Sequence, residues 1–381
     1  FSAWSSRQDT PSLEALRVLI GPKAEVFESE DWEYNAEKVL AQTPTTEHCI
    51  ITVIGAATIK DIIPWIKNQL VSHSISERLP DLNILHEPEW SEITTLGAGQ
   101  TQHACYEPQT VEELQELMRF AKRYSLKTLI LGAGSNMVGC DQLFDGIIIR
   151  LRLGEFSEIT IEGKNARVGA GIKWLKLIKR LQEDNLGGAE ALAAVPGSIG
   201  GGIRMNAGAQ GQETSEFVIA VHGIDQDAKL KSYQNDEITW SYRSCSLPND
   251  FIVTSIDMKF KAAVPQRSKA IVQSTRDFRK KTQPGGRNPG CAFRNPGDVA
   301  AGQLIDKYGF KSISFPHCAV SDLHANFFVN DNKCSADEYA RLMEYVQQGV
   351  YDACGIRLQQ EVVFSDKRKI NVVKALKIAV L

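Results

Sequence analysis

The sequence predicts an α+β protein of two to three domains, and three observations lead to this fold class. The chain has 381 residues, which fits two to three domains of about 100–200 residues each. Its 43% hydrophobic and 23% charged residues are typical of a folded globular chain and exclude a disordered or collagen-like one. Short β segments and separate helices follow one another without the strict strand–helix alternation of a doubly wound sheet.

Charge and cysteine content narrow the class of protein further. The formal net charge is −3 and the sequence pI is about 6.2, whereas a nucleic-acid-binding protein usually carries a strong positive excess. No apolar run approaches the roughly 20 residues that cross a bilayer. None of the 8 cysteines forms a CxxC pair, and no His/Cys cluster has zinc-site spacing. We therefore expect a cytoplasmic protein with reduced thiols, no metal, no nucleic-acid partner and no membrane contact.

Residues 1–70 have the pattern of a small α/β segment. The apolar, β-branched run Cys49–Ile54 is typical of a buried parallel strand. Pro80 and Pro88 predict a linker over 71–92. Helices are expected around 13–19, 37–41 and 59–70.

Beyond residue 93 the predicted elements change in type along the chain. Apolar residues at helical spacing after Thr110 predict a helix over 111–124. The apolar runs Thr128–Leu131 and Gly146–Leu151 predict strands on either side of a glycine-rich loop. Short β segments are expected over about 155–260, further helices over 172–184, 300–308 and 336–353, and further strands over 326–330 and 360–364.

Two glycine-rich loops are candidates for a dinucleotide-binding site. The first, Gly132–Asn136, directly follows a strand, and the second, Pro196–Gly208, contains several glycines in a row. Glycine lets the backbone approach an anion closely, and consecutive N–H groups form a concave nest for phosphate. The first loop has neither the Walker A nor the GxGxxG pattern, and by itself it could be a tight turn. Two such loops separated by a β region favour a dinucleotide site.

Three further stretches carry side chains that suit acid–base chemistry beside an anion. Cys291 is close in sequence to Arg294 and Asn295, which suits a proton donor next to an anionic ligand, with a buried structural cysteine as the alternative. Glu361 lies within an apolar strand, where a carboxylate is costly unless it is paired or functional. A structural pair with an arginine such as Arg243 is the alternative for that carboxylate.

Taken in order, these stretches resemble the UDP-N-acetylenolpyruvoylglucosamine reductase family, the flavoenzymes of bacterial peptidoglycan synthesis. The resemblance covers about 94–364. It rests on Thr95–Gly99, Gly132–Asn136, Pro196–Gly208, Tyr242–Ser244, Gln283-Pro284, Gly290–Pro296, Ala301–Asp306, Val320–Phe327 and Leu358–Val362. It implies an FAD-binding unit of the vanillyl-alcohol-oxidase (PCMH) type in two parts, followed by an α+β substrate-binding domain. The implied boundaries are 93–153 and 154–280 for the FAD-binding parts, 281–358 for the substrate-binding domain, 359–366 for a strand returning to the FAD unit and 367–381 for a tail.

The resemblance also implies a reaction. NADPH would reduce a noncovalently bound FAD, and the hydride would then pass to the double bond of UDP-N-acetylglucosamine enolpyruvate to yield UDP-N-acetylmuramate. At the matching positions, Arg243 would bind the substrate carboxylate, Cys291 would donate a proton and Glu361 would be the catalytic carboxylate. The implied substrate-binding residues are Lys281, Arg294, Asn295 and His324. The implied FAD contacts are Gly132, Ala133, Gly134, Ser135, Asn136, Pro196, Gly197, Ser198, Gly200, Gly201, Asn206, Ala207 and Gly208.

Two other functions stay open at this point. A different flavin oxidase of the same fold would be favoured by a covalently attached FAD, for which His103 and Cys105 are the candidates. A non-catalytic scaffold that keeps the flavin as a structural cofactor is the second alternative. The presence of Arg243, Cys291 and Glu361 argues against a scaffold.

The two ends of the chain resemble other enzymes of the same pathway. Ile50–Ala56 and the helix expected after it resemble the last strand and helix of UDP-N-acetylmuramate–alanine ligase, and Leu376–Leu381 resembles the first strand of a D-alanine–D-alanine ligase. We hypothesise that the chain is a segment of a polypeptide fused to these ligases. A lineage-specific extension at the N-terminus is the alternative.

Overall fold

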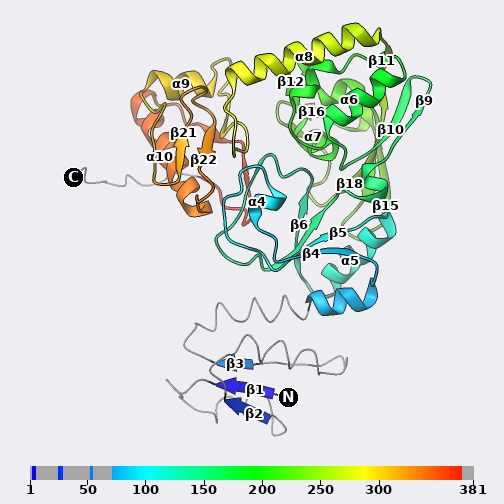
Figure 1. Cartoon of the computed structure of the whole chain (residues 1–381), viewed down its shortest axis with the longest axis vertical. Helices are drawn as coiled ribbons and strands as arrows, with labels where there is room; N and C mark the ends of the chain where they lie inside the picture. The colour runs from blue at the N-terminus through cyan, green and yellow to red at the C-terminus, as the bar shows by residue number, and fades with distance from the viewer. Residues whose placement is uncertain (1, 6–24, 29–51, 55–70, 371–381) are drawn as a thin grey trace. The chain divides into compact units, whose positions relative to one another are not determined.

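A computed structural model describes residues 71–370 and, before them, three short strands (Figure 1). The chain divides into two compact units, Phe1–Ser74 and Ile75–Leu381. In the first unit, β1 (Ser2–Ser5) pairs in parallel with β2 (Glu25–Glu28) and with β3 (Thr52–Ile54). The parallel strand predicted over 49–54 is thus confirmed at its C-terminal end. Outside the described residues lie the helices predicted around 13–19, 37–41 and 59–70 and the end segment 376–381.

The second unit contains a four-stranded sheet in the order β4-β5-β8-β6. Its strands are β4 (Asn83–His86), β5 (Ala104–Glu107), β6 (Lys127–Leu131) and β8 (Gly146–Arg150), and α5 (Val111–Arg123) connects β5 to β6. β5 and β6 both pair in parallel with β8. The side chain of Thr110 accepts a hydrogen bond from the N–H of Glu113 and so caps α5. These elements confirm the helix predicted over 111–124 and the strands predicted over 128–131 and 146–151.

The segment 71–92 differs from the linker that the sequence predicts. Residues 71–78 are helical, β4 pairs antiparallel with β5, and α4 (Trp90–Ile93) buries Trp90 completely. Pro80 and Pro88 flank β4 and do not interrupt it, so they mark the ends of an edge strand.

The following part of the second unit is built on a five-stranded antiparallel sheet in the order β15-β14-β18-β10-β9. α6 (Trp174–Glu183) packs Trp174, Leu177 and Leu181 into the same core as this sheet. The β-rich stretch over 155–260 and the helix over 172–184 are confirmed. The strands are β9 (Ile159–Glu162), β10 (Asn165–Gly169), β14 (Val218–Ile224), β15 (Leu230–Gln234) and β18 (Ile252–Lys259), with smaller strands β11 (Leu186–Gly187), β12 (Gly208–Ala209), β13 (Gln212–Glu213), β16 (Trp240–Ser241), β17 (Ser244–Cys245) and β19 (Lys261–Ala262).

Two helices of this part are not expected from the sequence. α7 (Ile199–Met205) forms within the second glycine-rich loop, and the Ser198 side chain caps it by accepting a hydrogen bond from the N–H of Gly201. α8 (Pro265–Thr282) has no clear apolar stripe, because its buried residues are Ser268, Val272 and Thr275. α8 runs from this part towards the C-terminal elements (Figure 1).

The C-terminal elements form a C-terminal cluster whose core also includes Leu96, Ala98 and Val138 from the first part of this unit. α9 (Ala301–Lys307), α10 (Ala336–Cys354), β21 (Cys318–Val320) and β22 (Phe328–Asn330) contribute to it and confirm the helices predicted over 300–308 and 336–353 and the strand over 326–330. The strand predicted over 360–364 is divided in two. β23 (Gln359–Gln360) pairs with β20 (Phe293–Arg294), and β24 (Val363–Phe364) pairs in parallel with β7 (Met137–Val138). Glu361 therefore lies where the chain crosses from the C-terminal cluster to the loop after β6.

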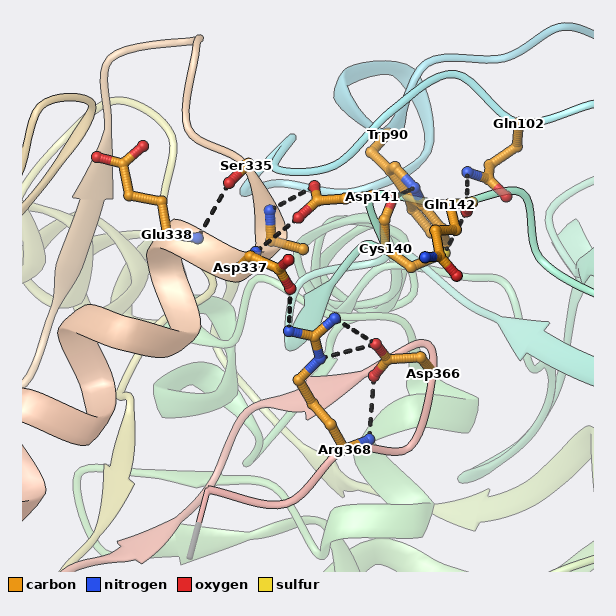
Figure 2. Close-up of polar contacts among 11 residues, drawn as sticks. Trp90, Gln102, Cys140, Asp141, Gln142, Ser335, Asp337, Glu338, Asp366 and Arg368 are labelled. Carbon is orange, nitrogen blue, oxygen red and sulfur yellow. Dashed lines mark hydrogen bonds and ion pairs between the residues drawn. The ribbon is translucent and has the colours of Figure 1, made fainter. Parts of the chain in front are cut away.

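A polar junction joins the loop after β7 to the start of α10, as Figure 2 shows. The Asp141 carboxylate accepts hydrogen bonds from the N–H groups of Ala336 and Asp337, both at 2.7 Å. Arg368, after β24, forms ion pairs with Asp366 and Asp337. A carboxylate is favoured at a helix N-terminus by the unpaired N–H groups and the helix dipole. The junction therefore fixes α10 against the part of the chain that carries the first glycine-rich loop. Over 71–370, no helix has both the length and the apolar character needed to cross a membrane.

Candidate active site

A cavity of about 450 Å³ lies where the two glycine-rich loops, α8 and the loop before β20 meet. Its volume is in the range of small-molecule and cofactor sites. Arg243, Cys291 and Glu361 line it, although they are far apart in the sequence. The predicted loop residues that line it are Gly132, Ala133, Gly134, Ser135, Asn136, Pro196, Gly197, Ser198, Gly201, Ala207 and Gly208.

The first glycine-rich loop forms one wall through close contacts that only glycine allows. Gly134 has a φ of +63°, and a Cβ there would lie 2.2 Å from a carbonyl oxygen of α4. A Cβ on Gly132 would lie 2.1 Å from the Oγ of Ser198, so the first loop touches the N-cap of α7. At the end of the loop, the Nδ2 of Asn136 donates a hydrogen bond to the backbone oxygen of Glu361 at 3.1 Å. The first loop is therefore held against both the second loop and the Glu361 segment.

The glycines of the second loop have different roles. A Cβ on Gly200 would lie 2.9 Å from the Cβ of Ala170, and a Cβ on Gly202 would lie 3.0 Å from the Nε1 of Trp174. These two glycines let α7 pack closely against the protein core. A Cβ on Gly201 would find only one described heavy atom within 4 Å, at 3.5 Å. Gly201 thus leaves space at the cavity wall that a larger side chain would fill.

Gly200 and Asn206 are the two predicted FAD contacts that do not line the cavity. Asn206 ends α7 in the left-handed conformation with a φ of 41°, and it is fully buried. Its Nδ2 donates a hydrogen bond to the Oε2 of Glu213 at 2.7 Å. Both residues serve the packing and termination of α7.

Arg243 and Glu361 form an ion pair at the cavity wall. The Nε of Arg243 lies 3.1 Å from the Oε1 of Glu361, but this N–H forms no well-aligned hydrogen bond with any described residue. The Glu361 side chain is only 10% exposed. Burial raises the pKa of Glu361, and the charges of Arg243 and Arg294 offset this only in part.

The thiol of Cys291 is the second acidic group at this wall. Its backbone forms a β-bridge with Phe327, and the neighbouring Ala292 oxygen accepts a hydrogen bond from the N–H of Glu361 at 2.9 Å. Burial raises the pKa of Cys291 to about 12; the charge of Glu361 adds to this effect and that of Arg243 opposes it. The thiol therefore keeps its proton at neutral pH.

Four predicted substrate-binding residues do not line this cavity: Lys281, Arg294, Asn295 and His324. The Oδ1 of Asn295 accepts a hydrogen bond from the N–H of Ala301 at 3.0 Å and so supports the start of α9. The Nδ1 of His324 accepts a hydrogen bond from the N–H of Asn326 at 3.2 Å, and burial lowers the His324 pKa.

Arg294 and Lys281 differ in their relation to the cavity. The Nε of Arg294 is buried without a hydrogen-bond partner among the described residues, and its charge lowers the pKa of Glu361. Arg294 thus affects the site electrostatically. Lys281 is exposed in the last turn of α8.

His103 and Cys105, the candidates for covalent attachment of FAD, also lie away from the cavity. Cys105 is fully buried in β5, where burial raises its pKa to about 12. Burial also lowers the pKa of His103.

The contribution of α8 to the cavity is not among the features that the sequence predicts. Thr275, Phe278 and Arg279 line it, and their spacing of three and four residues places them on one face of the helix. That spacing beside a basic run is the signal that could have identified them. Gln210 and Pro289 also line the cavity, and neither is predicted from the sequence as a site residue.

The residues present fit FAD. Two glycine-rich loops bring backbone to one cavity, and the space beside Gly201 is of the kind that a close-packed ligand fills. Among the described residues, no group of three His, Cys, Asp or Glu side chains could hold a metal. The mixed fold, the cavity between two glycine-rich loops and the acidic groups at its wall are those expected of a flavin-dependent oxidoreductase.

Comparisons with known proteins give the particular family. The model for the FAD binding domain matches 103–233, and the model for the UDP-N-acetylenolpyruvoylglucosamine reductase C-terminal domain matches 282–365. The reductase of Bacillus subtilis (strain 168) is 30% identical over 299 residues, which are 77% of this chain and 97% of that protein. The reductase of Orientia tsutsugamushi (strain Boryong) is 32% identical over 289 residues, 74% of this chain and 93% of that protein. The crystal structure of the Thermus caldophilus reductase matches with a TM-score of 0.64 at 29% identity, covering 74% of this chain and 98% of that one. The chain belongs to the UDP-N-acetylenolpyruvoylglucosamine reductase family.

Proposed function

We propose that Arg243, Cys291 and Glu361 together perform the chemistry of this family in this chain. As a family member, the chain is an FAD-containing oxidoreductase that reduces UDP-N-acetylenolpyruvoylglucosamine with NADPH, a step of peptidoglycan precursor synthesis. The observation that supports the three assignments is convergence, because these side chains line one cavity together with both glycine-rich loops.

The protein would bind the cofactor mainly through backbone groups of the two glycine-rich loops. The residues that would hold FAD are those of Gly132–Asn136 and Pro196–Gly208 that line the cavity, with Gly201 leaving room for the ligand. When bound, FAD supplies hydride transfer between NADPH and the enolpyruvyl double bond.

Arg243 places positive charge where the substrate carboxylate gains electron density. Hydride addition to the terminal carbon of the double bond leaves an electron pair on the carbon beside the carboxylate, and the carboxylate shares that charge. A guanidinium presents parallel donors that match a carboxylate. The Nε of Arg243 is ion-paired with Glu361 but forms no well-aligned hydrogen bond among the described residues, so its N–H can turn to the substrate carboxylate when the pair with Glu361 weakens.

Cys291 holds the proton that completes the reduction. Its S–H bond breaks as the new C–H bond forms on the carbon beside the carboxylate, and the thiolate then regains a proton from solvent. A pKa of about 12 ensures that the thiol starts protonated at neutral pH. The positive charge of Arg243 favours the thiolate that is left behind.

Glu361 orients Arg243 through the ion pair at 3.1 Å. Because burial raises its pKa, Glu361 loses charge more readily than an ordinary glutamate. Protonation of Glu361 would release Arg243 for the substrate carboxylate and remove a negative charge beside the Cys291 thiolate.

Turnover of the purified chain tests this function. The protein should carry flavin absorbance and consume NADPH in proportion to added enolpyruvyl substrate, with UDP-N-acetylmuramate as product. NADPH consumption that is independent of this substrate would contradict the proposal and favour another oxidase of the same fold.

We also propose a wider context for the reductase. The working boundaries are 93–153 and 154–280 for the FAD-binding parts, 281–358 for the substrate-binding domain and 359–366 for the return strand.

Two observations support a polypeptide fused to the two neighbouring ligases. One is the parallel sheet of β1, β2 and β3, and the other is the resemblance of Ile50–Ala56 and Leu376–Leu381 to segments of those ligases. A native gene product of 42.2 kDa would contradict the fusion.

Because the substrate is a peptidoglycan precursor, we propose a bacterial cytoplasmic enzyme whose loss disturbs cell shape and division.

A further inference from the structure

The rim of the cavity on α8 carries two side chains that the mechanism above does not use, Phe278 and Arg279. Phe278 lines the cavity and is 57% exposed. A single exposed apolar residue is ordinary on a protein surface. Here, however, the exposed ring borders the ligand cavity and is followed directly by an arginine.

Arg279 is a half-buried cation at the same wall. Its guanidinium donates a hydrogen bond to the backbone oxygen of Ala194, and no described carboxylate forms an ion pair with it. Burial lowers the pKa of Arg279, but an arginine keeps its charge in proteins. A cation that is partly removed from water without a carboxylate partner favours binding of an anion.

The helix holds these two side chains in place. On the same face, the buried Thr275 donates a hydrogen bond from its Oγ1 to the Oε1 of Gln210 at 3.2 Å. The Arg279–Ala194 hydrogen bond attaches the next turn of α8 to the segment just before the second glycine-rich loop. Phe278 and Arg279 therefore sit on a helix that is fixed at two points beside the loop.

We propose that Phe278 and Arg279 recognise a nucleoside diphosphate, with the Phe278 ring stacking on the base and the Arg279 guanidinium pairing with a phosphate. Aromatic stacking accepts any base, and arginine is suited to phosphate geometry. The proposal rests on the proposed function, in which a nucleotide with a base and phosphates can reach this site from two kinds of source. One is the UDP of the substrate, and the other is the adenine nucleotide of FAD or NADPH.

Variants of the full-length holoprotein test the proposal. Phe278→Ala and Arg279→Gln remove the ring and the charge, and Phe278→Tyr keeps a ring at the same place. Lys280→Ala is the matched control, because Lys280 is exposed in the same turn and does not line the cavity. Three affinities are measured: the Kd of FAD for the apoprotein, the Kd of UDP alone from flavin fluorescence, and the NADPH concentration for half-maximal flavin reduction.

We expect Phe278→Ala and Arg279→Gln to weaken the same one of these affinities by roughly 10-fold or more. Phe278→Tyr and Lys280→Ala should stay within about twofold of the wild type. Loss of UDP affinity identifies the substrate as the ligand, whereas loss of FAD or NADPH affinity identifies that dinucleotide. The proposal is overturned if both variants keep all three affinities or if Lys280→Ala weakens them equally. Since FAD and UDP binding are measured without turnover, they decide the matter even if the enolpyruvyl substrate proves not to be reduced.

Discussion

Replacing Cys291 with alanine should divide the proposed reaction into a normal half and a slow half. The substitution removes one sulfur atom that borders the cavity, while the β-bridge between Cys291 and Phe327 involves only backbone. We expect a loss of stability of about 1 kcal/mol or less, so the fold and FAD binding should persist. A general acid typically contributes about 10²–10⁴-fold, or roughly 3–5 kcal/mol of the barrier. Reoxidation of the flavin by the enolpyruvyl substrate should slow by that factor, because the carbanionic product of hydride addition lacks its acid.

Stopped-flow absorbance of the flavin, measured separately for the two halves, gives the result. Reduction by NADPH should be nearly normal in Cys291→Ala, since no proton from the thiol is needed there. Cys291→Ser should recover part of the loss because a hydroxyl can also donate a proton. Equal slowing of both halves would show that Cys291 shapes the flavin pocket, and no slowing of either half would refute its role as the acid.

Three other variants test the remaining assignments. Gly201→Val should lose FAD on purification, because the added side chain fills the open space at the cavity wall; full flavin content would show that this space is not used. Arg243→Lys should fold and bind FAD but lose about 10²–10³-fold in kcat, since a point charge cannot replace a planar fork; near-normal turnover would assign Arg243 a structural role. Glu361→Gln should raise the Tm at pH 7 and change it little at pH 4. The reason is that burial raises the pKa of Glu361 in the folded protein above its value in the unfolded chain. Below the unfolded pKa the carboxyl is protonated in both states. As the pH rises through the folded pKa, the folded protein has to ionise a buried carboxyl and loses stability, and glutamine avoids this loss. The same Tm shift at both pH values would show that titration of Glu361 is not involved.

Local signals explain which elements the sequence predicts. α5 has a threonine cap and an apolar stripe within one stretch of chain, so its pattern suffices to predict it. α8 lacks such a stripe, since two of its three buried residues are Ser268 and Thr275, and its position is decided by tertiary contacts. Within the second glycine-rich loop, α7 forms because Gly200 and Gly202 allow close packing on Ala170 and Trp174, which propensity alone does not reveal.

The candidate site depends on long-range contacts in the same way. The pattern around Glu361 predicts one continuous strand, but the structure divides it because one end pairs with β20 and the other with β7. The hydrogen bond from Asn136 to the Glu361 backbone spans 225 positions, and no local signal predicts such a contact. Residue type drew attention to Cys291 and Glu361 but left a structural alternative for each, and the resemblance to the reductase family selected them together with Arg243. The cavity-facing side of α8 has a weaker signal, which is the spacing of Thr275, Phe278 and Arg279 beside a basic run.

The most direct test of the central claim is an anaerobic titration of the flavin in the wild-type protein. One equivalent of NADPH should bleach the flavin absorbance, and one equivalent of the enolpyruvyl UDP-sugar should restore it while forming one equivalent of UDP-N-acetylmuramate. A flavin that is bleached by NADPH but not reoxidised by this substrate without oxygen would contradict the assignment of Arg243, Cys291 and Glu361 to its reduction.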